Sequence, residues 1–142
     1  MHTNSKNYIK FLVSSLFLSI LLGNIVSAKS LDQSSNLVCS AIDIIGCTTG
    51  LKCSEGNAQS FDLPNFMFIN FAKKSVHAKN QNGDEYTSPI KNFEITKSQL
   101  ILQGVENHRG WSAAINRETG NISISSVGDD VSIMVFGACT AI

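Results

Sequence analysis

The chain has 142 residues with 11 basic and 11 acidic side chains, and 43% of its residues are hydrophobic. This length suits one domain with one buried core and leaves no room for a second. The balanced, evenly spread charge lacks the clustered basic surface that nucleic acids and anionic membranes select, so we expect neither as a partner.

The first 28 residues have the pattern of a secretory signal peptide. Lys6 and Lys10 precede an apolar run over residues 11–22, and residues 26–28 are the small residues that signal peptidase accepts. The run is shorter than the roughly 20 residues that span a bilayer, which favours cleavage over a retained anchor. We therefore predict a signal peptide over residues 1–28 and a periplasmic or secreted chain that begins at Lys29, with no stable membrane insertion.

All four cysteines lie after this leader, and export would place them in an oxidising compartment where thiols pair. Three pairings are open. We favour Cys47 with Cys53, because Gly50 between them allows the chain to reverse, and this leaves Cys39 to pair with Cys139. The spacing is neither the paired C-x2-4-C of structural zinc nor the C-x-x-C of redox proteins, so we expect no metal and no cofactor.

The start of the mature chain divides into two short segments. Residues 29–36 are polar and serine-rich, which predicts a flexible lead-in that contributes nothing to the core. Residues 37–142 then form a single disulfide-bonded β domain. Within it, Val38, Ile42 and Ile45 recur at roughly helical spacing before Gly46, which favours a short helix or helical turn over residues 37–45.

From residue 65 onward the sequence alternates short apolar runs with turn residues, as in antiparallel sheets. The predicted strands cover residues 66–71, 76–79, 90–96, 100–103, 109–116, the arm that carries Ile122 and Ile124, and residues 131–139. Seven strands without an intervening helix form a meander, which protects its edges by curling into a barrel or packing as a sandwich. We predict a mainly β fold, an antiparallel meander that forms a small barrel, half-barrel or sandwich, with a short disulfide-tied N-terminal segment.

Two strands carry candidate contact residues. Trp111, Ala113 and Ile115 share one side of their strand, so Trp111 is either a large core residue or a stacking surface for a ring in the barrel mouth. The run with Phe66 and Phe68 is apolar on both faces, which indicates a strand that is covered on both sides or that faces a partner.

Several short stretches resemble a family of small uncharacterised exported bacterial proteins. They are residues 46–47, 63–64, 101–106, 109–112, 115, 119–120 and 136–139, the last reading Phe-Gly-Ala-Cys. The likeness spans roughly residues 39–140 and includes the four-cysteine pattern. It implies a bacterial periplasmic setting and no catalytic residue.

Catalytic motifs are weak throughout the chain. His77 lies in a predicted strand and His108 in the loop before Trp111, where surface or capping roles are more common than metal binding or general-base catalysis. Ser112 does not lie in the G-x-S-x-G elbow that exposes a nucleophile. We therefore expect that the protein is not an enzyme.

Three functions follow from these patterns, in decreasing order of preference. The first is a non-enzymatic module that binds a small ligand or an envelope protein through residues among Trp111, His108, Arg109, Phe66 and Phe68. The second is a periplasmic inhibitor of a hydrolase such as lysozyme, by analogy of fold, with a protruding loop over residues 80–86 or 106–110 that would block an enzyme cleft. The third is an enzyme that uses His77 or His108 with a loop carboxylate.

Overall fold

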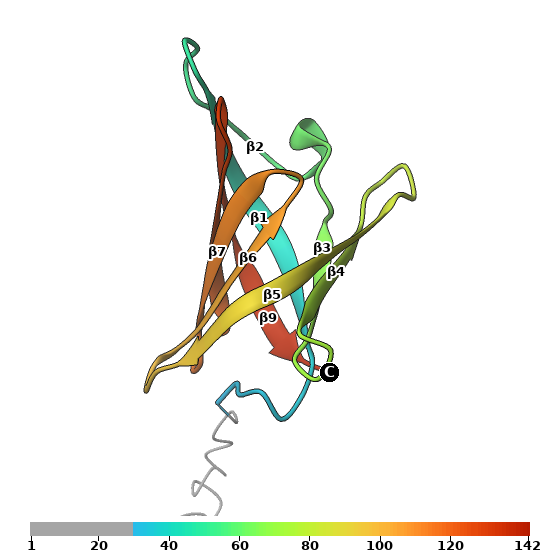
Figure 1. Ribbon diagram of the computed structural model, residues 1–142, viewed down its shortest axis with the longest axis vertical. Helices are drawn as coiled ribbons and strands as arrows, with labels where there is room; N and C mark the ends of the chain where they lie inside the picture. The colour runs from blue at the N-terminus through green and yellow to red at the C-terminus, as the bar shows by residue number, and fades with distance from the viewer. Residues whose placement is uncertain (1–29) are drawn as a thin grey trace, which may run out of the picture.

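Alternating apolar and polar side chains build a closed antiparallel barrel of eight strands (Figure 1). The computed structural model describes residues 30–142, so the predicted signal peptide and its cleavage before Lys29 lie outside the described residues. The barrel strands are β1 (Leu37–Thr48), β3 (Phe66–Asn70), β4 (Ser75–Lys79), β5 (Glu85–Ile95), β6 (Gln99–Glu106), β7 (Arg109–Asn116), β8 (Asn121–Val127) and β9 (Val131–Ala141). The short β2 (Ser54–Gly56) pairs with the second half of β1.

The prediction of a short helix over residues 37–45 is wrong, because this segment is the first part of β1. The apolar residues at helical spacing are not the buried ones: Ile42 is exposed, and Val38 and Ile45 are only partly buried. Leu37, Cys39 and Ile44 are buried instead, and a β-bulge between Ala41 and Asp43 shifts the alternation from odd to even positions. Because the bulge interrupts the two-residue alternation of β1, its apolar residues recur at a spacing that resembles that of a helix.

β1 also closes the barrel. It pairs with β3 through its first four residues and with β9 along its whole length, while every other barrel strand pairs with its neighbours in sequence. Gly137 of β9 lies opposite Ala41 at the bulge, and a Cβ there would collide with the Ser40 carbonyl oxygen. Among the three predicted architectures, the structure is therefore the closed barrel.

Both predicted disulfides are confirmed. Cys39 pairs with Cys139 directly across the β1–β9 seam, with sequence separation 100. Cys47 pairs with Cys53 across the turn after β1, in which Gly50 has φ +78°. Disulfides of this kind form in an oxidising, non-cytoplasmic environment.

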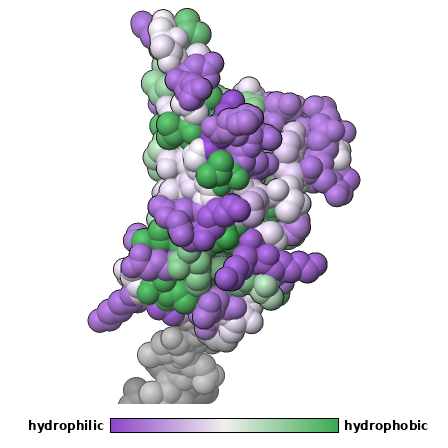
Figure 2. Space-filling view, viewed as in Figure 1, coloured by the Kyte–Doolittle hydropathy of each residue, from purple (hydrophilic) through white to green (hydrophobic). Residues whose placement is uncertain are grey.

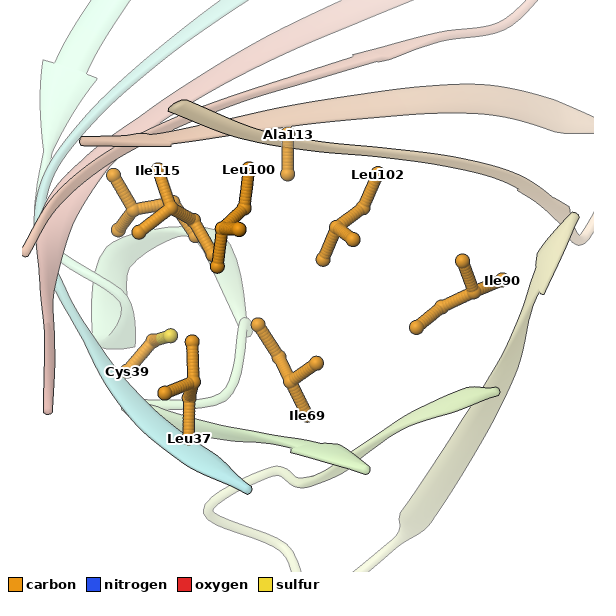
Figure 3. Close-up of a cluster of buried hydrophobic side chains, with 9 residues drawn as sticks. Leu37, Cys39, Ile69, Ile90, Leu100, Leu102, Ala113 and Ile115 are labelled. Atoms are coloured by element: carbon orange, nitrogen blue, oxygen red, sulfur yellow. The ribbon is translucent and has the colours of Figure 1, made fainter. Parts of the chain in front are cut away.

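The core lies inside the barrel, where inward side chains from the strands around it point toward one another (Figure 3). Its buried members are Leu37, Cys39, Ile69, Ile90, Leu100, Leu102, Ala113, Ile115 and Ile122. The prediction that Ala113 and Ile115 share the inward side of β7 is confirmed.

One end of the barrel, the closed end, is covered by residues 30–36 and by the turns that follow β3, β5 and β7 (Figure 1). Contrary to the expectation of a segment without core contacts, Leu31 packs against the core. Its backbone N–H donates to the Arg117 carbonyl, and its own carbonyl accepts from Arg117 Nε at 2.9 Å. The N-terminal segment is thereby tied across this end.

The opposite end, the open end, carries the β6–β7 and β8–β9 turns and the segment of residues 57–65 between β2 and β3. The β4–β5 hairpin projects beside it and is covered mainly by hydrophilic side chains (Figure 2). Within that hairpin Asn80 is buried, and its amide is fully engaged: it accepts from the Asp84 N–H and donates to Asp84 Oδ2 and Tyr86 Oη.

Candidate functional site

The open half of the barrel encloses a mainly apolar cavity of about 430 Å³. It exists because short inward side chains leave the space near the barrel axis unfilled. These are Ala78, Ser88, Ala113 and Ser126, on four different strands. Toward the closed end, the larger Ile69 and Leu102 form the floor of the cavity and belong to the core.

Trp111 forms one wall of this cavity. It lies directly opposite Gly104 of β6, and a Cβ at Gly104 would collide with the indole, so the ring lies across the inner surface of β6. The indole Nε1 reaches β5 and donates to Ser88 Oγ at 2.7 Å. The hydrogen bond from its N–H therefore fixes the indole ring, and the apolar surface of the ring lines the cavity.

The segment of residues 57–65, here called the mouth strap, crosses the open end and contains η1 (Gln59–Phe61). The Phe61 ring sits against Gly46 and Gly56, where any Cβ would collide with it or with Ser60. Asn57 and Ser60 hold the turn, since each backbone N–H donates to the other's side chain. Sequence patterns assigned no role to this strap, although its residues 63–64 are among the stretches that carry the family resemblance.

Polar and charged side chains line the rim of the cavity. The β6–β7 turn is a two-residue turn, with Asn107 at φ +48° and His108 at φ +63°, and it places Glu106 opposite Arg109. Glu106, Asn107 and Arg109 all line the cavity mouth. The mouth is thus polar and the interior apolar, which is the usual arrangement of a small-molecule site.

The predicted contact residues divide between two surfaces. Trp111 and Arg109 both line the cavity, and His108 lies exposed in the turn just outside it. Phe66 and Phe68 point away from the barrel interior, with 55% and 47% of their surface exposed, while Met67 and Ile69 between and after them face inward. The aromatic face of β3 is therefore separate from the cavity.

His77 lies on β4, on the outer side of the barrel wall. Its ring nitrogens hydrogen-bond to Ser75 Oγ at 2.8 Å and to Thr87 Oγ1 at 2.9 Å. Both partners are hydroxyl groups. Within residues 30–142, no group of three or more His, Cys, Asp or Glu side chains is arranged to hold a metal ion.

Comparisons with known proteins identify no relative: the chain matches no protein-family model, and neither a curated protein nor a solved structure is significantly similar to it. In the described part of the chain, no helix has the length and apolar character needed to cross a membrane. The cavity geometry therefore carries the functional argument.

Proposed function

We propose that this protein is a non-enzymatic binding protein of the bacterial periplasm that holds one small, mainly apolar molecule in the open half of its barrel. The cavity is the observation that supports this most. Natural ligand pockets span about 300–1,000 Å³, and an engineered apolar cavity of about 150 Å³ binds benzene. A volume of about 430 Å³ therefore suits a molecule of two or three rings.

The location in the periplasm rests on two predictions from the sequence and on the disulfides. The predicted signal peptide directs export, the resemblance to exported bacterial proteins implies that compartment, and the two disulfides require an oxidising one. A diffusible carrier or sensor of an apolar compound fits such a setting, because transfer of an apolar molecule from water into an apolar cavity is favourable.

The test uses a neutral fluorescent probe, N-phenyl-1-naphthylamine, whose emission rises in apolar surroundings. The chain has one tryptophan, so tryptophan emission comes from the cavity wall alone. We expect a saturable rise in probe emission together with quenching of Trp111, with a stoichiometry of one. A rise without Trp111 quenching would indicate binding at another surface and would contradict the proposal.

A matched pair of variants locates the probe. Ser126 lines the cavity beside Trp111, whereas Ser125 is the preceding residue of β8 and points to the opposite face. We expect Ser126→Phe to abolish the saturable signal because the new ring occupies the cavity, while Ser125→Phe binds like the unsubstituted protein. Thermal unfolding of both variants shows whether each is folded. Unchanged binding by a folded Ser126→Phe variant would exclude the cavity as the site.

A further inference from the structure

Arg109 and Trp111 present two different chemistries to one ligand. They lie two residues apart on the same inward side of β7, and both line the cavity. A strand advances about 3.3 Å per residue, so their Cα atoms are separated by roughly 7 Å along the strand. The indole forms the apolar wall, and Arg109 lies above it at the rim.

The guanidinium of Arg109 has no partner within the described residues. Among residues 30–142, the Arg109 side chain forms no ion pair and no hydrogen bond; the ion pair found there joins Lys79 to Glu85. The aliphatic part of Arg109 lies against Gly128 of the β8–β9 turn, where Cγ comes within 3.0 Å of the position of a Cβ. The stem is therefore supported, while the five N–H donors of this exposed residue are open to a ligand because no described residue accepts from them.

The acidic side chains near the mouth do not neutralise this charge by contact: Glu106 and Asp62, which line the cavity, and Asp129 and Asp130 of the β8–β9 turn form no ion pair with Arg109. Glu106 lies opposite Arg109 in the register, yet no oxygen of its carboxylate comes within 4.0 Å of the guanidinium. Asp62 accepts a hydrogen bond from Asn82 Nδ2 at 3.4 Å. Arg109 is thus a charged group at the mouth whose aliphatic stem is packed against the protein and whose N–H groups can donate to a bound ligand.

We propose that the ligand is an amphipathic acid, with a flat apolar body against Trp111 and a carboxylate bound by Arg109. This rests on the proposed function, because it assigns the chemistry of the molecule in the same cavity. A planar guanidinium binds a carboxylate through two parallel N–H···O bonds, which are stronger than neutral hydrogen bonds.

The test compares three probes with the same ring and different heads: 2-naphthoate, 2-naphthylmethanol and 2-naphthylmethylammonium. Isothermal titration calorimetry gives the affinity of each at neutral pH. We expect naphthoate to bind about tenfold more tightly than the alcohol, as one charge-assisted hydrogen-bonded pair provides, and the ammonium to bind most weakly.

Two charge variants at the mouth make the assignment specific. Arg109→Gln is expected to remove the preference for naphthoate and to leave binding of the alcohol unchanged. Glu106→Gln is expected to strengthen naphthoate binding, because it removes a negative charge that faces the same head group. Glu106→Gln keeps the side-chain length, whereas Arg109→Gln shortens the side chain; both residues lie at the rim, and thermal unfolding of each variant shows whether it is folded.

The outcomes separate the two proposals. Equal affinities for all three probes, or a preference for the ammonium that Glu106→Gln abolishes, would overturn the acidic ligand and leave the apolar cavity site intact. If none of the three probes binds, the cavity is not a site for such molecules and both proposals fall.

Discussion

At the scale of single residues, the cavity depends on a reciprocal fit between Trp111 and Gly104. The indole occupies the space that a side chain at Gly104 would need, and the Pro89 carbonyl oxygen lies equally close to that position. Trp111 is then held by one hydrogen bond to Ser88, which is 5% exposed. A large ring can thus lie along a barrel wall without filling the interior.

Substitution of Ser88 tests this anchor. Ser88→Ala leaves the indole N–H without an acceptor in a site that water reaches poorly, so we expect a loss of about 1–3 kcal/mol in the free energy of unfolding. Ser126→Ala is the control, because Ser126 lines the same cavity without a hydrogen bond to Trp111, and a change within about 0.5 kcal/mol is expected. Urea unfolding measures both, and equal effects would contradict an anchoring role.

At the scale of elements, the N-terminal segment seals the closed end of the barrel. Arg117 accepts the Leu31 N–H through its carbonyl, and its guanidinium donates to the carbonyls of Leu31, Thr96 and Lys97. One side chain therefore joins three segments: residues 30–36, the β5–β6 turn and the β7–β8 turn. This explains why a polar segment contributes a partly buried leucine that packs against the core.

Arg117→Gln removes the charged donor from this junction. We expect a loss of about 1.5–3 kcal/mol in the free energy of unfolding, since hydrogen bonds from charged donors are worth that much. Glu118→Gln changes the neighbouring exposed residue and should alter stability by less than about 0.5 kcal/mol. Hydrogen exchange gives an independent readout: the Leu31 amide should lose protection in Arg117→Gln, and retained protection would show that the segment is held by other contacts.

At the scale of the whole molecule, stability depends on the seam where the first strand meets the last. A meander forms its other pairings between neighbours in sequence, but the β1–β9 pairing joins residues about a hundred positions apart. Closing so long a loop costs chain entropy, and the Cys39–Cys139 bond removes part of that cost from folding by restricting the unfolded chain.

The two disulfides should therefore differ in their effect. In the chain-entropy model, Cys39→Ala/Cys139→Ala is expected to lower the free energy of unfolding by about 4.7 kcal/mol, whereas Cys47→Ala/Cys53→Ala, which opens a loop of sequence separation 6, should cost only about 2 kcal/mol. Denaturant unfolding of both double variants gives the comparison. A larger loss for the short loop would show that native packing outweighs chain entropy at these sites.

Much of the local structure follows from the sequence, because strand periodicity and turn chemistry are properties of neighbouring residues. All seven predicted strands after residue 65 are present, Ala113 and Ile115 are buried, and the favoured cysteine pairing is confirmed. The β1 segment was mistaken because its bulge breaks the two-residue alternation, and only pairing with β9 makes that bulge visible.

The sequence by itself determined the strands after residue 65 and the inward side of β7, since these depend on local alternation. It also favoured the cysteine pairing that the structure has, since only three pairings were possible. The tertiary structure alone decided that the sheet closes and that it leaves a cavity. Ala78, Ser88, Ala113 and Ser126 come from four strands, and their short side chains meet only once register and closure bring them to one level of the barrel. Non-local pairing therefore determines where the space lies and why Arg109 and Trp111 border it.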